Sequence, residues 1–305
     1  MNRIRALQEQ AVEVTQEAAL GAEAGEPLTM EGLPDWISHH IGDDYVIEFA
    51  GLHLDLHGLA IEPIQLGGLT LDLSPTRHLV VMLLVAAFLA AVFIPVARVI
   101  RSRGVEKAPS GFANSMEAMI LYFRDEVVRP NIGHGADGYT PFILTLFFFI
   151  LGMNLIGLTP LGVTPTANLS VTAALATISF IVIEISGFRA LGPAGYARTI
   201  FFLPPGVPTV MKPLMVAILA PVELLGKLTK PFALAVRLLA NMTAGHTLIL
   251  ALLGMIFVLR SYLMGVGSVA LASVLMILEL FVAFLQAYIF AMLTSVFIGL
   301  IRHAH

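Results

Sequence analysis

The sequence lacks cysteine and has few charged residues. None of its 305 residues is cysteine, which excludes disulfides, thiol catalysis and cysteine-bound metals. Charged residues make up only 12% of the chain and hydrophobic residues 57%, which excludes an ordinary soluble globule and is typical of a protein that crosses the membrane several times. The net charge of -4 and the lack of a basic tract argue against nucleic acid as a partner. The N-terminal stretch has no apolar core like that of a signal peptide, so we expect it to be retained.

Residues 1–75 form a polar region that we expect to be an extramembrane domain on the outside face, followed by a transmembrane channel domain at residues 76–305. Apolar periodicity between residues 7 and 20 is weak and predicts at most one surface helix. Residues 45–73 alternate between apolar and polar side chains, and glycines separate the runs. This pattern predicts a small antiparallel β-hairpin element.

A row of polar residues in this β element has the composition of a metal site. His53, Asp55 and His57 are two residues apart, so on a strand they would share one face. We interpret the row as a solvated strand face and expect neither a metal nor a cofactor.

Five apolar segments follow, each long enough to span a bilayer. The first three approach the ~20 residues that a bilayer core requires, and the last two are much longer. They cover residues 78–97, 139–158, 169–187, 213–259 and 266–301. As one helix, even the shorter of the last two would reach roughly 50 Å, against a hydrocarbon core of about 30 Å. We predict an all-α membrane protein whose last two segments, joined by a turn at residues 260–265, form a long hairpin that is tilted, broken or partly in the membrane plane.

Positive residues between the spans predict the orientation. Arginine and lysine are concentrated after the first span and between the third and fourth, whereas the opposite loops carry few. This bias puts the N-terminus outside and the C-terminus in the cytoplasm, which five crossings satisfy. Between the first two spans, apolar residues at helical spacing predict an amphipathic helix on the cytoplasmic surface. They are Phe112, Met116, Met119, Ile120, Phe123 and Val127.

Arg237 is the residue that a purely structural reading explains least. It lies near the middle of the fourth apolar segment, where an arginine costs about 2.5–3.5 kcal/mol and cannot lose its proton. Residues spaced three or four apart form one helical stripe, which comprises Glu223, Lys227, Lys230, Leu234, Arg237 and Asn241. His246 lies nine residues beyond Arg237 and therefore on the opposite face. In the next segment, Glu279 and Gln286 are seven apart and share a face. Pro231 is expected to kink or bend the fourth segment.

The predicted topology gives these side chains different depths. Glu223 lies near the cytoplasmic side and Arg237 lies deep. Glu279 and His246 lie toward the outside. Carboxylates and imidazoles can change protonation near neutral pH once their surroundings shift them, whereas arginine cannot. The arrangement suits two proton paths that must not join.

Several of these residues also have a simpler explanation. We interpret Lys227 and Lys230 as long side chains that reach the cytoplasmic interface. Glu223 is either a channel group or the partner of these lysines. His246 alone could bond a carbonyl, and Glu184 on the third span is either structural or part of a path.

Three sequence runs make a family resemblance specific. The run KPFALAVRLLANMTAGH resembles the signature of subunit a of the F-type ATP synthase, the stator half of its proton channel. FLQAYIFAMLTSVFIGL resembles the last helix of that family, and NLIGLTP resembles the outer end of its second span. The resemblance covers roughly residues 75–302 and leaves out the first seventy or so.

The resemblance implies a role for each matching residue. Arg237 matches the family's essential arginine, which faces the rotor ring of c subunits and prevents leakage. Asn241 and Gln286 match its polar neighbours at that interface. His246 and Glu279 match the two outer half-channel positions, where the family has an acid and a histidine in either order.

The resemblance also implies a second path and several partners. Glu223 matches an acid of the cytoplasmic path, and Asn154, Asn168 and Glu184 are weaker matches. The implied partners are the c-subunit ring, peripheral-stalk b subunits, the rest of the F-type ATP synthase and the lipid bilayer of a bacterial inner membrane. The chain would translocate ions without catalysing a reaction itself. A proton- or sodium-coupled secondary transporter is the alternative, although the sequence has no internal repeat. An intramembrane enzyme is disfavoured because HExxH and GxSxG are both missing.

Overall fold

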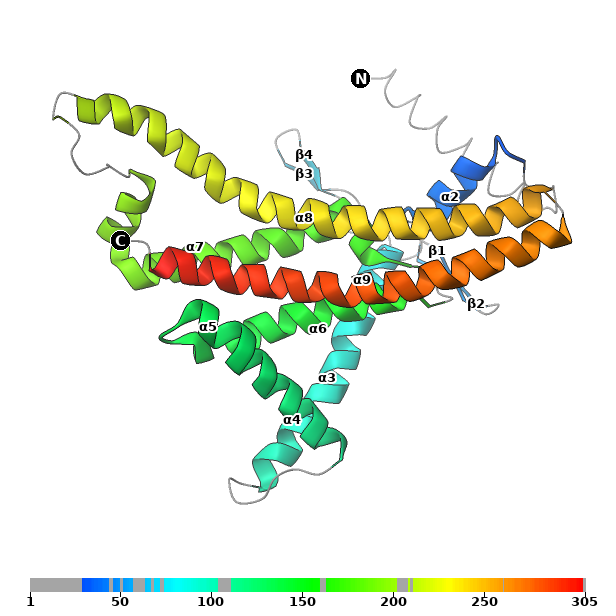
Figure 1. Ribbon diagram of the computed structural model, residues 1–305, viewed down its shortest axis with the longest axis horizontal. Coiled ribbons are helices and arrows are strands. Elements are labelled where there is room, and N and C mark those ends of the chain that lie inside the picture. Colours follow the sequence, from blue (N-terminus) through cyan, green and yellow to red (C-terminus); the bar gives the residue numbers. More distant parts are fainter. Residues whose placement is uncertain are drawn as a thin grey trace. The chain divides into compact units, whose positions relative to one another are not determined.

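A computed structural model gives the fold, which is mostly helical (Figure 1). The described residues are 29–43, 46–49, 52–56, 64–66, 69–71, 74–103, 111–159, 163–201, 208, 211–259 and 261–303. The chain forms two compact units. Unit 1 comprises Met1–Leu84, Met153–Asn168 and Ala240–Ala283; unit 2 comprises Val85–Gly152, Leu169–Leu239 and Phe284–His305.

Within the described residues, five helices are long and apolar enough to cross a membrane, which confirms the predicted number of spans. They are α3 (Arg77–Arg103), α6 (Thr140–Gly157), α7 (Leu169–Ile200), α8 (Lys212–Leu259) and α9 (Tyr262–Arg302). α6 matches its predicted span closely. α3 and α7 extend past theirs because helical hydrogen bonding continues into polar turns, where an apolar run has already ended.

α7 contains a break that the sequence analysis missed. Gly192 has φ of 69°, a conformation that glycine adopts without the steric strain of other residues. Pro193 follows it and has no N–H to continue the helical ladder. The helix therefore continues past the predicted apolar segment at residues 169–187, to Ile200, and changes direction at Gly192.

α8 and α9 form the predicted long hairpin. α8 is one helix of 48 residues that continues through Pro221 and Pro231. α9 has 41 residues and begins at Tyr262, so the turn is shorter than the predicted 260–265. Figure 1 shows the two helices meeting at this turn and returning alongside each other. Each unit contains one part of both helices.

The predicted amphipathic helix is three consecutive helical pieces: α4 (Phe112–Tyr122), the π-helical turn η2 (Phe123–Val128) and α5 (Arg129–Ile132). Phe123 and Val127 of the predicted apolar face are buried. Phe112 is exposed and does not belong to that face, a correction that follows from its position at the free start of α4. The π-helical turn changes the register, so no single helical spacing fits the whole segment.

The end of α9 packs against this segment in unit 2. Arg302 Nη2 donates to the carbonyl of His134 at 2.8 Å, and His303 Nε2 lies 3.2 Å from the carbonyl of Ile132. Ser295 Oγ donates to the carbonyl of Val127 at 3.5 Å. The short helix η3 (Ala136–Gly138) then leads into α6.

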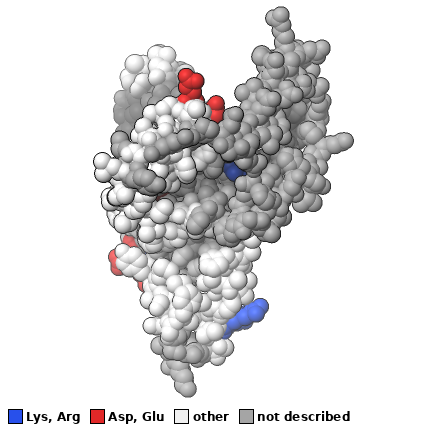
Figure 2. Space-filling model, turned by 90° about the vertical axis from the view of Figure 1, so that its right-hand side faces the viewer, with Lys and Arg blue, Asp and Glu red and all other residues white. Residues whose placement is uncertain are grey.

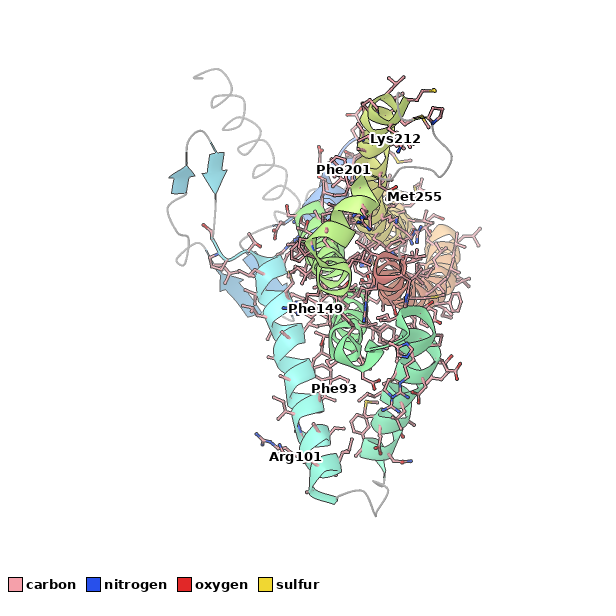
Figure 3. The ribbon with its side chains drawn as sticks, turned by 90° about the vertical axis from the view of Figure 1, so that its left-hand side faces the viewer. Phe93, Arg101, Phe149, Phe201, Lys212 and Met255 are labelled. Atoms are coloured by element: carbon pink, nitrogen blue, oxygen red, sulfur yellow. The ribbon has the colours of Figure 1, made fainter. Side chains whose placement is uncertain are left out.

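α6 is the most enclosed of the five spans. Half of its most apolar window, 50%, is buried inside the protein, against 17% for α3. Ile143, Phe147 and Ile150 recur at spacings of four and three and are completely buried, so they form one core-facing stripe. The ring of Phe147 lies 4.4 Å from that of Phe123 in η2 and 5.6 Å from that of Phe284 in α9. Figure 3 shows Phe93 of α3 directed toward α6, and its ring lies 4.6 Å from that of Phe148.

The described N-terminal residues contain one helix and four strands. The helix α2 (Leu33–Ile41) was not predicted. β1 (Val46–Phe49) pairs with β2 (Leu52–Asp55), and β3 (Ile64–Leu66) pairs with β4 (Leu69–Leu71), both antiparallel. The predicted β-hairpin element is confirmed, and it consists of two hairpins in place of one. His53 and Asp55 lie in β2, whereas His57 and the predicted helix at residues 7–20 lie outside the described residues.

Candidate functional site

The polar stripe predicted on α8 is divided between two environments. Arg237 and Asn241, one turn apart, are exposed on the surface of the chain. Leu234, three residues before Arg237 on the same stripe, is buried. The stripe runs along the edge of the buried face of α8, and a shift of about 60° around the helix axis separates inside from outside. On α9, Gln286 is buried, as is Glu279 seven residues earlier.

His246 of α8 and Glu279 of α9 are in direct contact inside unit 1. His246 Nδ1 lies 2.6 Å from Glu279 Oε1, and the two residues are only 9% and 5% exposed. His246 Nε2 lies 2.9 Å from the carbonyl oxygen of Gly157 and 2.7 Å from Thr164 Oγ1. Two helices that the sequence predicted to run antiparallel thus join an acid and an imidazole.

These contacts assign the protons of the His246–Glu279 pair. The carbonyl of Gly157 can only accept, so Nε2 of His246 carries a hydrogen. The other ring nitrogen then shares one hydrogen with Glu279: either imidazolium faces carboxylate, or neutral imidazole accepts from carboxylic acid. Both forms have the same net charge. A proton can therefore move between the two side chains without adding a buried charge.

The surroundings of Glu279 are tight beside one carboxylate oxygen and leave the other oxygen without a hydrogen bond from the described residues. A Cβ atom at Gly245 would lie 2.6 Å from Glu279 Oε1, so only glycine fits beside the acid. Glu279 Oε2 is buried and has no hydrogen-bond partner among the described residues. A buried carboxylate oxygen requires a partner, and water is the group that can supply it without changing the protein.

Thr164 and Thr166, in the segment before α7, support this site and were missed by the sequence analysis. That segment includes the short helix η4 (Pro165–Ala167). Thr164 bonds His246, and Thr166 Oγ1 donates to Asn154 Oδ1 at 2.7 Å. Asn154 Nδ2 in turn donates to the carbonyl of Ala283 at 3.3 Å. The available signal was the alternation of polar side chains in a short loop between two apolar spans, a place where functional groups are common.

A second polar cluster lies in unit 2, around Lys227 of α8. Lys227 Nζ lies 3.5 Å from Glu184 Oε2 and 3.2 Å from Thr199 Oγ1, and its residue is 8% exposed. It also lies 4.3 Å from the centre of the Tyr196 ring, and the Tyr196 hydroxyl donates to Glu184. The predicted extension of Lys227 to the interface is therefore wrong. Twelve residues of straight helix would separate Tyr196 from Glu184 by roughly 18 Å, so the break at Gly192 is what brings them together.

An open cavity of about 110 Å³ borders this cluster. Glu184, Glu223, Lys227 and Lys230 all line it, together with apolar residues of α7 and α9. Glu223 is exposed, and the acid that pairs with Lys227 is Glu184. Lys230 lies 5.2 Å from the centre of the Phe297 ring. The cavity thus combines two acids and two cations at one end of unit 2.

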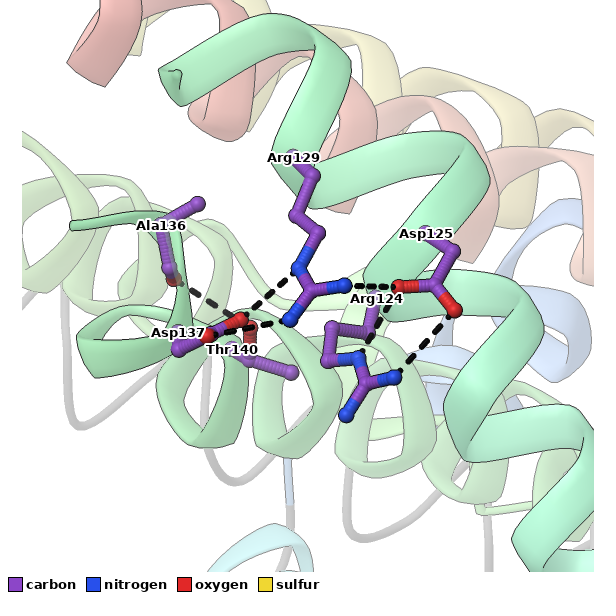
Figure 4. A network of polar contacts seen from close by, with 6 residues as sticks. All are labelled: Arg124, Asp125, Arg129, Ala136, Asp137 and Thr140. Atoms are coloured by element: carbon purple, nitrogen blue, oxygen red, sulfur yellow. Dashed lines mark hydrogen bonds and ion pairs between the residues drawn. The ribbon is translucent and has the colours of Figure 1, made fainter. Parts of the chain in front are cut away.

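A charged network on the α4–α5 segment lies outside the five spans (Figure 4). Arg129 binds Asp137 through two nitrogens at 3.0 and 3.1 Å and reaches Asp125 at 2.8 Å. The hydrogen bond and charge of Arg124 lower the pKa of Asp125, with help from Arg129. The hydrogen bond from Arg129 likewise lowers the pKa of Asp137, and the two acids raise the pKa of Arg129.

Comparison of the sequence with known proteins identifies its family. Residues 79–299 match the family described as ATP synthase A chain. The chain belongs to this family. ATP synthase subunit a from Chloroherpeton thalassium is 44% identical over 86% of the chain and 75% of that protein. Subunit a from Anaeromyxobacter dehalogenans is 43% identical over 93% of the chain and 76% of that protein. The protein called ATP synthase subunit a 2 from Chlorobaculum tepidum is 40% identical over 92% of the chain and 76% of that protein.

The family match includes every predicted site residue of the transmembrane helices. Membership in the ATP synthase A chain family decides against the secondary transporter and the intramembrane enzyme. One expectation needs correction. An alignment that covers 93% of the chain must include part of the first seventy residues, so the likeness is not confined to the spans.

Proposed function

We propose that this chain is the stator subunit of the proton channel of an F-type ATP synthase, with two half-channels on either side of Arg237. Family membership supports the assembly, and the His246–Glu279 contact is the observation that carries the ion path. An acid and an imidazole 2.6 Å apart, buried between membrane helices, can exchange a proton, which purely apolar helices cannot. The chain conducts ions, and ATP chemistry belongs to other subunits.

The outer half-channel delivers protons to the His246–Glu279 pair. The pair with one shared hydrogen is neutral, and an incoming proton converts it to imidazolium beside carboxylic acid. Burial disfavours this added charge, so the pair releases a proton inward and returns to the neutral form. Net transfer is one proton per cycle, with no other bond made or broken. Glu279 Oε2, which has no hydrogen-bond partner among the described residues, is the atom at which water joins this path.

The exposed side of α8 meets the ring of c subunits. Exposure of both Arg237 and Asn241 supports a partner outside this chain. A ring carboxylate that has received a proton can enter lipid at a much lower free energy than an ionised one. When the carboxylate returns, the fixed charge of Arg237 favours its ionised form and prevents protons from passing directly between the half-channels. Each elementary charge that crosses 100 mV contributes about 2.3 kcal/mol to rotation.

The cytoplasmic half-channel ends at the cavity beside Lys227. Glu223 and Glu184 provide two carboxylates there, and Lys227 with Tyr196 holds Glu184 in place. A proton released at Arg237 passes along α8 toward these acids and the cytoplasm. The N-terminus lies outside and the C-terminus inside, in a bacterial inner membrane, and the b subunits of the peripheral stalk are further partners.

Replacing the central arginine tests the proposal. In inverted membrane vesicles that hold the complete ATP synthase, we expect Arg237→Ala to abolish ATP-driven acidification while the complex remains assembled. The physical reason is that no permanent cation then favours the ionised ring carboxylate. The measurement is the fluorescence of a pH-sensitive dye, with assembly checked by co-purification of the c ring.

Arg101→Ala is the matched control, because this exposed arginine at the end of α3 lies apart from the polar cluster of the long hairpin in sequence. Figure 3 shows its side chain directed away from the helix. We expect normal acidification from this control. Acidification by Arg237→Ala at the wild-type rate would refute the proposed channel.

A further inference from the structure

Unit 1 contains a second acid–imidazole contact at the start of α3. His78 Nδ1 lies 3.0 Å from Oδ1 of Asp43, which follows α2. The imidazole side chain is only 3% exposed, whereas that of Asp43 is 27% exposed. The contact therefore joins a solvent-accessible carboxylate to a buried imidazole. An accessible group followed by a buried one is the arrangement expected where a proton path opens to water.

Each protonation state of His78 finds a partner. Asn168 Nδ2 lies 3.3 Å from His78 Nδ1 and 3.4 Å from Asp43 Oδ2. When Nδ1 of the imidazole is bare, it can accept from the amide of Asn168. When Nδ1 carries a hydrogen, it can donate to Asp43, and the amide can donate to the other carboxylate oxygen. A purely structural histidine needs only one of these arrangements.

The other nitrogen of His78 faces inward. Nε2 is buried and has no hydrogen-bond partner among the described residues. Because a buried polar nitrogen needs a partner, an internal water is the group that this position accepts. Glu279 Oε2, at the first acid–imidazole contact of unit 1, is another buried atom of this kind.

One short segment connects the two acid–imidazole contacts. Residues 163–168 present a polar side chain at every second position: Thr164 bonds His246, Thr166 bonds Asn154, and Asn168 bonds His78. The segment thus contacts both imidazoles within five residues of chain. These polar side chains can hydrogen-bond water molecules along the segment between the two imidazoles.

We propose that Asp43 and His78 form the outermost proton-exchanging station of the outer half-channel and supply the His246–Glu279 pair. This inference rests on the proposed function. A proton from the outside water binds Nδ1 of His78 and forms a new N–H bond. The imidazolium then loses its proton from Nε2 to internal water, which passes one proton inward and leaves a neutral ring with its hydrogen on Nδ1. Before the next proton binds, the ring must return to the tautomer that carries its hydrogen on Nε2. Asp43 stabilises the charged intermediate.

The polar and charged groups that meet at this station are Asp43, Asn168, Thr76 and Arg77. Arg77 donates to the carbonyl of Gly42, next to Asp43, and so holds the acid-bearing segment on α3. Burial raises the pKa of Asp43, but the hydrogen bonds and charge of His78 lower it by more. The acid therefore stays ionised at neutral pH and is available to stabilise an imidazolium.

The test is a pH profile of the complete ATP synthase in inverted vesicles, where the lumen corresponds to the outside. ATP synthesis is driven at a fixed membrane potential and fixed external pH, while the lumenal pH varies from about 5 to about 8, the range in which histidine titrates. We expect His78→Gln to reduce the rate about tenfold at the alkaline end and little at the acidic end. Glutamine keeps hydrogen bonding but cannot carry the proton, and abundant protons make a collecting group unnecessary.

His134→Gln, at an exposed histidine of unit 2, is the matched control and should follow the wild-type profile. A rate for His78→Gln that is unchanged, or lowered equally at every lumenal pH, would overturn the inference. If the variant does not assemble, Asp43→Asn gives the same test with the same expected profile. His246→Ala separates the two proposals. If His246→Ala abolishes ATP synthesis while His78→Gln matches the wild type, only the Asp43–His78 station is refuted. If His246→Ala synthesises ATP at the normal rate, the proposed channel itself is refuted.

Discussion

At the scale of single residues, Gly245 determines whether the acid of α9 can reach the imidazole of α8. It precedes His246, and a Cβ atom in its place would lie 2.6 Å from Glu279 Oε1. That separation is far below an ordinary van der Waals contact, so a methyl group must displace the carboxylate. Packing an extra methyl group into a filled site costs about 1–3 kcal/mol.

We predict that Gly245→Ala slows ATP-driven acidification about tenfold, because one misplaced hydrogen bond of roughly 1.4 kcal/mol changes a rate by that factor. Gly226→Ala is the matched control on the same helix, since a Cβ atom there meets nothing within 4 Å. Both variants gain the same methyl group. Equal rates for the two would show that the contact with Glu279 is not needed for transport.

The residues of the two clusters differ in how far the sequence could predict them. The contact of His246 with Glu279 follows from helical arithmetic, because both lie a similar distance from a tight turn between antiparallel helices. The pairing of Lys227 with Glu184 could not be predicted. It depends on a chain reversal at Gly192 that only the three-dimensional fold reveals. The contacts of Thr164 with His246 and of Thr166 with Asn154 could not be predicted either, because they join a loop to side chains distant in the sequence.

At the scale of elements, the α4–η2–α5 segment is fixed outside the spans by charge as well as by apolar contact. Two arginines and two aspartates form one network there, and Arg129 bridges both acids. Its pKa shifts have a consequence for stability. The folded state lowers the pKa of Asp125 and Asp137 below the unfolded value of about 3.9. The network therefore stabilises the segment fully above that pH and loses its effect as the pH falls further.

We predict that hydrogen–deuterium exchange of residues 123–138 in the purified complex accelerates below about pH 4, after correction for the intrinsic pH dependence of exchange. Asp137→Asn should exchange faster already at neutral pH and respond less to acid. The effect is small because exposed ion pairs contribute little. Glu126→Gln, at an exposed acid of η2 that makes none of these bonds, is the control. Identical exchange in both variants would assign the segment's stability to its apolar face alone.

Element boundaries show where local sequence patterns stop being sufficient. Apolar length predicts α6 closely, because that helix is enclosed and its sequence is uniformly apolar. The same criterion ends α7 too early, since its last residues are polar yet helical. The π-helical turn η2 could not be predicted either, because the spacing of apolar residues was read with the single period of an α-helix. α2 was missed although its apolar residues recur at helical spacing, because a run of nine residues is shorter than the window in which that spacing is normally read.

At the scale of the whole molecule, most of the surface of the long helices is left for lipid and for other subunits. Only 17% of the most apolar window of α9 and 22% of that of α8 are buried within the chain. Charged side chains are few among the described residues on the face drawn in Figure 2. The hydropathy of a segment depends only on its own residues, so the five spans could be counted from the sequence. What covers them depends on partners that the chain's own sequence does not contain.

We predict that opposite ends of the first span face opposite sides of the membrane. A cysteine at Ser38 should react with a membrane-impermeant thiol reagent in intact cells, and a cysteine at Ser102 only in inverted vesicles. Both serines are exposed, and the natural chain has no cysteine that could react instead. The physical basis is the concentration of positive residues after α3. Labelling of Ser102→Cys from the outside of intact cells would reverse the proposed orientation.

The contacts at the end of α9 bear on how the chain is made. Arg302 bonds the carbonyl of His134, and His303 lies beside the carbonyl of Ile132, although the paired residues are 168 and 171 positions apart in the chain. During synthesis the α4–α5 segment emerges early, yet the carbonyls that Arg302 and His303 cap have no such partner until α9 has been translated. The contact between this early segment and α9 can therefore form only late in synthesis, after the last span has been translated.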